Sequence, residues 1–99
     1  MDFEQFQGSL NQNQPPPELS LVLAALWWDA KGDWTRAHEC AQQHETPEHA
    51  WVHAYLHRKE GDLDNAGFWY RRAGKPVCKG PLEAEWREIA EASLASQRK

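Results

Sequence analysis

A short motif that occurs twice constrains the fold of this chain more than any other feature. The stretches KGDWTRA and EGDLDNA, residues 31–37 and 60–66, lie 29 residues apart and share a Gly-Asp pair and an alanine. Glycine readily ends a helix in the left-handed conformation, and aspartate is a good N-cap for the helix that follows. Each pair therefore predicts a sharp corner between two helices, and the fixed spacing predicts two stacked helical hairpins.

The apolar residues between these corners repeat with the period of a helix. From residue 19 they follow the i, i+3, i+4, i+7 pattern, and no segment alternates with a period of two. Helix caps and breakers divide the chain into a hairpin over residues 18–45, a second hairpin over residues 46–74 and a last helix over residues 81–97. We therefore expect an all-α domain of about five helices, in which stacked antiparallel hairpins are followed by a C-terminal capping helix.

The first 17 residues differ in composition from the rest. The segment MDFEQFQGSLNQNQPPP is rich in Gln, Asn and Pro. Such a composition buries too little apolar area to offset the entropy of ordering, so residues 1–17 are predicted to form a flexible tail. Phe3, Phe6 and Leu10 fall at helical spacing and form a candidate docking motif, although isolated apolar residues in a tail are more often incidental.

Charge, cysteine content and hydropathy narrow the class of protein. Eleven basic and fifteen acidic side chains give a net charge of -4, which disfavours general nucleic-acid binding. The longest apolar run, Leu19 to Trp28, is too short to span a bilayer, and the N-terminus lacks a signal segment. Cys40 and Cys78 form no CxxC pair. We expect a cytoplasmic protein with neither nucleic acid nor membrane as a partner.

With these corners and alanines, the chain resembles tetratricopeptide-type repeats over roughly residues 19–76. The second unit carries most of the resemblance, through Ala54, Gly61, Asp62, Leu63, Ala66, Tyr70 and Ala73. The spacing of 29 residues is shorter than the 34 of that family, and there are only two units. The resemblance implies a concave face, formed by the first helix of each hairpin, that binds a peptide of another protein.

Carried over by position, the resemblance places the peptide-binding groove on Glu48, Trp51, Tyr55, Arg58 and Lys59. Two aromatic rings followed by two cations suit an extended peptide that carries a carboxylate. The leading prediction is therefore a non-catalytic interaction module that needs no cofactor. The alternative for the aromatic residues is that a chain this short folds them into its own core.

Histidines recur every four residues on the third predicted helix, at His49, His53 and His57. This spacing puts them along one face, and His38 lies on the preceding helix. His53, His57 and His38 are candidate ligands of a divalent transition metal such as zinc, with Glu60 as another possible third ligand. An open position on the metal beside an acid would permit hydrolysis. In the other interpretation, the histidines are buried polar residues that hydrogen-bond across the hairpin.

Three consecutive aromatic residues, Phe68, Trp69 and Tyr70, lie on the fourth predicted helix. Residues 100° apart around a helix cannot all face the same core. Tyr70 is expected to face inward, so Phe68 or Trp69 packs against Trp86 of the last helix, faces solvent, or makes the chain a structural homo-oligomer such as a homodimer. Gly67, in the middle of the same helix, predicts a close approach of another backbone.

Overall fold

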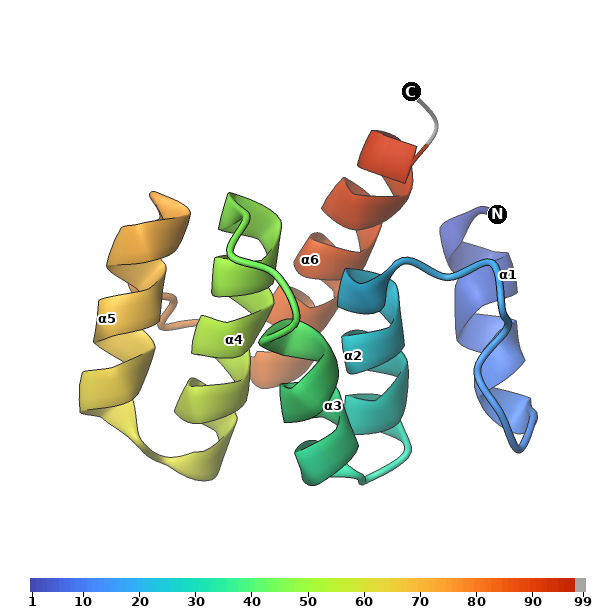
Figure 1. Ribbon diagram of the computed structural model, residues 1–99, viewed down its shortest axis with the longest axis horizontal. Coiled ribbons are helices and arrows are strands. Elements are labelled where there is room, and N and C mark those ends of the chain that lie inside the picture. The colour runs from blue at the N-terminus through green and yellow to red at the C-terminus, as the bar shows by residue number, and fades with distance from the viewer. Residues whose placement is uncertain (98–99) are drawn as a thin grey trace.

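The computed structural model describes residues 1–97, and over these residues the chain contains six α-helices, one 3-10 helix and no strand (Figure 1). In chain order these are α1 (Phe3–Gly8), the 3-10 helix η1 (Ser9–Asn11), α2 (Leu21–Ala30), α3 (Trp34–Ala41), α4 (Pro47–Glu60), α5 (Leu63–Ala73) and α6 (Leu82–Gln97). The predicted all-α class is confirmed.

Both Gly-Asp corners fold as predicted. Gly32 and Gly61 have φ angles of 84° and 89°, in the left-handed region that glycine adopts without steric cost. The side chains of Asp33 and Asp62 each accept a hydrogen bond from the backbone N–H three residues later, which caps α3 and α5. As a result α2 packs against α3 and α4 packs against α5, and contact between α3 and α4 places the two hairpins side by side (Figure 1).

Alanines at matching positions of the two hairpins are buried. Ala25 and Ala37 in the first hairpin are fully buried, as are Ala54 and Ala66 at the matching positions of the second. A side chain as small as a methyl group lets packed helix backbones approach closely, which is consistent with the burial of these four alanines. The matching positions of the two Gly-Asp motifs thus carry buried alanines in both hairpins.

Helix α2 lies at the centre of the molecule. It contacts α3, α4 and α6, which explains why its apolar residues extend around most of its circumference. The helix is ten residues long, and Leu23, Leu26 and Trp27 are fully buried in it. Over residues 1–97, no helix combines the length and the apolar character that a membrane crossing requires.

The last helix, α6, packs across the first helices of both hairpins, α2 and α4. The Nε1 of Trp86 donates a hydrogen bond of 3.0 Å to the backbone oxygen of Leu26 in α2. Glu85, the residue before Trp86, is buried against α4. The helix therefore covers the face on which the resemblance had placed a peptide groove.

The N-terminal segment is ordered where a flexible tail was expected. Asp2 and Gln5 form a capping box at the start of α1. Phe6 is fully buried, and its ring stacks on Trp86 with 5.6 Å between centroids. The expectation from composition was wrong for this part of the segment. Composition counts apolar residues but does not register that helical spacing puts Phe3 and Phe6 against one large ring.

Candidate metal centre

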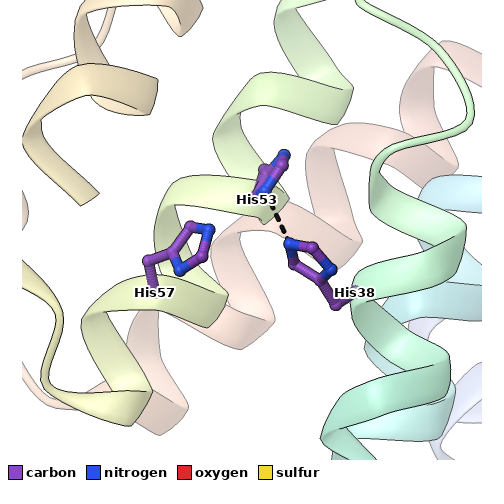
Figure 2. A group of neighbouring side chains, drawn as sticks. All are labelled: His38, His53 and His57. Atoms are coloured by element: carbon purple, nitrogen blue, oxygen red, sulfur yellow. Dashed lines mark hydrogen bonds between the residues drawn. The ribbon is translucent and has the colours of Figure 1, made fainter. Parts of the chain in front are cut away.

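Three histidines from two helices meet in the space between α3 and α4. His38 comes from α3, while His53 and His57 lie one turn apart on α4. One ring nitrogen of each residue lies within 4.8 Å of those of the other two. The Nε2 atoms of His38 and His53 are 2.9 Å apart, and Figure 2 shows the three side chains around a common space. The structure thus brings together all three predicted metal ligands, which we call the histidine cluster.

Local sequence fixes both helices that carry the histidine cluster. Thr46 caps the start of α4, and the four-residue spacing then puts His53 and His57 on the same face of the helix. Asp33 caps the start of α3, which places His38 more than one turn into that helix. Because each helix has its own cap, the ligands are held by regular structure and not by a loop.

Two tryptophan rings fix the planes of two of the imidazoles. Trp34 stacks on His38 with 4.8 Å between centroids and 11° between planes. Trp69, from α5, stacks on His53 at 4.0 Å and 16°. Trp34 is itself held by a hydrogen bond of 2.9 Å from its Nε1 to the backbone oxygen of Leu56. The aromatic walls limit ring rotation and exclude water from one side of each imidazole.

A carboxylate orients the third histidine. The Nδ1 of His57 lies 2.7 Å from Oε1 of Glu60, one turn further along α4. When neutral His57 donates from Nδ1, its Nε2 keeps the lone pair, which is the arrangement of many metal-bound histidines. Asp62 lies close to the same pair, but both of its oxygens bond Asn65 at the start of α5. Its role is therefore that of a helix cap.

Burial keeps two of the imidazoles neutral. Burial first, and then the nearby His38 and His57, together lower the pKa of His53 to about 4. Burial is also the main cause that lowers the pKa of His38, followed by His57. Neutral imidazole is the form that binds metal ions, so these two rings need not lose a proton near neutral pH. The 2.9 Å contact requires one of the two to donate its N–H and the other to accept.

The aromatic residues of the predicted peptide groove lie in the core. Trp51 and Tyr55 are only 6% and 2% exposed. The Nε1 of Trp51 donates to Glu85 at 3.2 Å, and the hydroxyl of Tyr55 donates to Asp29 at 2.8 Å. Because α6 covers this face, the two rings do not line an open groove for an extended peptide. This corrects the predicted groove in favour of the alternative that the chain buries both rings itself.

The two cations predicted for the groove pair with acids of the same chain. Arg58 forms an ion pair of 2.8 Å with Glu85, and Lys59 forms one of 2.9 Å with Asp29. Glu48 is half-buried in the first turn of α4. Arg58 and Lys59 therefore hold α6 and α2 against α4, and their charges are already paired within the chain.

Sequence reasoning missed the two acids at the centre of these contacts. Asp29 and Glu85 are 4% and 2% exposed. A signal for both was present in the spacing. Asp29 lies three residues after Leu26 on the buried stripe of α2, while Glu85 lies three residues after Leu82 and four before Ile89. Helical periodicity puts such positions inside the fold, where an acid requires partners.

The three consecutive aromatic residues of α5 face three directions. Tyr70 is buried and its hydroxyl donates to Glu85, with the two carboxylate oxygens at 2.9 and 2.7 Å. Trp69 is half-buried on the ring of His53. Phe68 is 42% exposed. The surplus aromatic that was expected to pack against α6 instead forms a wall of the histidine cluster.

Comparisons with protein-family models, with curated proteins and with solved structures give no match to this chain. The hairpins α2–α3 and α4–α5 accord with the resemblance to tetratricopeptide-type repeats, but paired antiparallel helices occur in many all-α folds. That resemblance stays a prediction, and the function is argued from the geometry of the histidine cluster.

Proposed function

We propose that this protein binds a divalent transition metal ion, with zinc the best match, through His38, His53 and His57. The observation that carries the proposal is the convergence of one nitrogen from each residue within 4.8 Å. Zinc–nitrogen bonds are about 2.0–2.1 Å long, so two nitrogens of a tetrahedral site lie about 3.3 Å apart. The existing arrangement is close enough for small side-chain rotations to complete such a site without a change in the helices.

The chemistry of the ligand set supports zinc. Imidazole nitrogens suit zinc, copper and nickel, whereas calcium and magnesium prefer oxygen ligands. Glu60 supplies the carboxylate that commonly orients a metal-bound histidine. Three protein ligands leave a fourth position for water or for a group from outside, which is the ligand count of catalytic zinc sites. Metal-assisted hydrolysis is the reaction class that such an open position supports.

The purely structural interpretation accounts for less of the geometry. A hydrogen bond between the hairpins explains the contact between His38 and His53. The spacing on α4 by itself brings the ring of His57 to 4.8 Å from that of His53, but a hydrogen bond between the hairpins does not require it also to lie 5.3 Å from that of His38. A shared metal ligand set requires all three rings to converge, so it is the better account of the cluster.

Calorimetric titration of the metal-depleted protein with zinc tests the proposal. We expect one ion per chain, and we expect His53→Asn and His57→Asn each to abolish measurable binding. His44→Asn is the matched control, because His44 is exposed and lies outside the cluster. Cobalt(II) added to the same protein should give the intense visible bands of a tetrahedral site. The absence of binding, or equal binding by all three variants, would contradict the proposal.

A further inference from the structure

Helix α1 lies against α6, at the opposite side of the molecule from α5 (Figure 1). The indole ring of Trp86 lies at the centre of this contact. Phe6 stacks on Trp86 at 5.6 Å, and Phe3 meets the edge of the same ring at 6.0 Å and 75°. The guanidinium of Arg87 lies 4.5 Å from the centroid of the Phe3 ring. The aromatic half of α1 therefore binds a ready-made aromatic and cationic surface of α6.

The C-terminal end of the same segment is held by groups from α2. The Nε1 of Trp27 donates to the backbone oxygen of Ser9 at 3.3 Å. The ammonium of Lys31 donates to the backbone oxygens of Leu10 and Gln12 at 2.8 and 3.2 Å. A cation at this end satisfies the carbonyls that a helix leaves unpaired and complements its dipole. Trp27, Lys31, Trp86 and Arg87 thus form an oriented receptor for a short helix, which we call the α1 docking surface.

Helix α1 has little stability of its own. It is six residues long, whereas isolated helices shorter than about 12–15 residues are marginal in water. Its helical form therefore depends on the docking surface. Residues 12–20, which include three consecutive prolines, connect it to α2 without regular helix. Release of α1 requires no change in the helices that form the rest of the fold.

Two open hollows lie beside the segment that occupies the docking surface. A hollow of about 340 Å³ lies beside Leu10 and is bordered by Tyr55, Lys59, Leu82 and Trp86. Another hollow, of about 400 Å³, borders the aromatic end of α1. Stable interfaces are packed as densely as protein interiors. The same helix from a second copy of this chain would leave the same spaces, whereas a helix with a larger side chain at the position of Leu10 would bury that side chain in the first hollow.

We propose that the α1 docking surface binds a short amphipathic helix of a partner protein, and that α1 occupies it as a displaceable intramolecular competitor. The partner helix follows the pattern of Phe3, Phe6 and Leu10, with a side chain larger than leucine at the third position. A tethered competitor acts at an effective concentration of the order of millimolar. It raises the apparent dissociation constant of the partner until α1 is released.

The probe for this proposal is a fluorescent peptide with the sequence of residues 1–12, together with a second peptide carrying Leu10→Phe. Both are titrated into the full-length chain. In the F3A/F6A variant α1 can no longer dock, and in the D2A/Q5A variant it loses only its exposed capping box. We expect both variants to bind the first peptide at least about tenfold more tightly than the wild type does. The matched control, Glu4→Gln, changes an exposed residue of α1 and should behave as the wild type.

Three further results decide the proposal. The Leu10→Phe peptide should bind at least about threefold more tightly than the first peptide, because its ring buries more apolar area. Adding Lys31→Ala to the D2A/Q5A variant should weaken binding again. If F3A/F6A loses the helical circular dichroism signal of the folded chain, the comparison between the wild type and D2A/Q5A alone tests the proposal. Equal affinity of the wild type and D2A/Q5A, or no binding by either, would overturn the proposal. Preference for the unmodified peptide would overturn it too, by assigning the surface to a second copy.

Discussion

The Nε2 atoms of His38 and His53 are 2.9 Å apart, so the space between them holds one proton and not two. A second proton between them would turn the accepting ring into a cation and set two N–H groups against each other inside a half-buried cluster, where His57 adds a third ring. The cluster therefore resists protonation while it keeps imidazole lone pairs turned inward. A metal ion supplies a positive charge to several lone pairs at once, which a proton on one ring cannot do.

Acid should destabilise the metal-depleted chain through His53. The pKa of this group is about 4 in the folded state, below its ordinary value of 6.5, so the unfolded chain takes up the proton first as pH falls. Its stabilising contribution is complete above pH 6.5 and is lost between pH 6.5 and 4, at a cost of about 2 kcal/mol by pH 5. Urea unfolding with a chelator at pH 7 and pH 5 measures the loss.

The matched variant for this measurement is His53→Asn, which cannot titrate in this range. It should lose less stability between pH 7 and pH 5 than the wild type does. Part of the loss should remain, because burial also lowers the pKa of His38 and of His49. An identical loss in the variant and the wild type would show that His53 is not the group responsible.

Removing the carboxylate of Glu60 should weaken zinc binding without removing a ligand. Glu60 holds Nδ1 of His57 at 2.7 Å, and loss of such a partner typically lowers metal affinity about 10–100-fold. Competition with a zinc-sensitive dye measures the affinity of Glu60→Gln. Asp64→Asn, which removes an exposed carboxylate four residues further along, should leave the affinity within about twofold of wild type. Equal effects of the two substitutions would show that Glu60 acts on zinc affinity only through its charge, and not through its contact with His57.

The parts of the fold that rest on local signals could be predicted. Gly32 and Gly61 predict the corners because only glycine easily adopts the left-handed conformation found there, and the capping aspartates follow directly in the sequence. The histidine cluster was predictable for the same reason. Its members on α4 are spaced by one helical turn, and the expected packing of α3 against the next helix brings His38 alongside.

The cover over α4 could not be predicted, because periodicity shows which residues face inward and not which helix covers them. Trp51 and Tyr55 have the same spacing whether they line an open groove or a core. These rings are in a core because α6 packs over them, with Glu85 buried against both α4 and α5. Such contacts join residues far apart in the chain, and a single sequence carries no direct signal for them.

Truncation of Glu85 should be among the most destabilising single changes in this chain. Glu85 accepts hydrogen bonds from Trp51, Arg58 and Tyr70 and is 2% exposed. Glu85→Ala leaves the cation of Arg58 without its buried partner, which typically costs about 3–5 kcal/mol. Glu85→Gln keeps an acceptor and should cost less. Urea unfolding at pH 7 measures both.

The control for this change is Glu88→Ala, three residues further along α6. Glu88 is exposed, so its loss should change the free energy of unfolding by no more than about 0.5 kcal/mol. If Glu85→Ala cost no more than this control, the buried network would not be what holds α6 over α4. Tight folding of the domain would then have to come from the apolar contacts of α6 alone.

Two glycines should respond to alanine with opposite signs. Gly61 has a φ of 89°, where an alanine side chain is strained, and Gly61→Ala should cost about 1–2 kcal/mol. The close backbone approach expected at Gly67 is wrong. A Cβ built there meets only Nη1 of Arg71, at 3.7 Å. Gly67→Ala should therefore stabilise the chain by up to about 1 kcal/mol, the helix propensity difference.

Thermal or urea unfolding of the two alanine variants compares them directly, since both changes add one methyl group to an otherwise unchanged chain. The expected difference between them is about 2–3 kcal/mol, and it arises from backbone conformation because neither methyl meets a crowded environment. A stabilising Gly61→Ala would mean that the second corner is not left-handed, which removes the turn that sets α5 against α4. A destabilising Gly67→Ala would instead restore a close contact at the middle of α5.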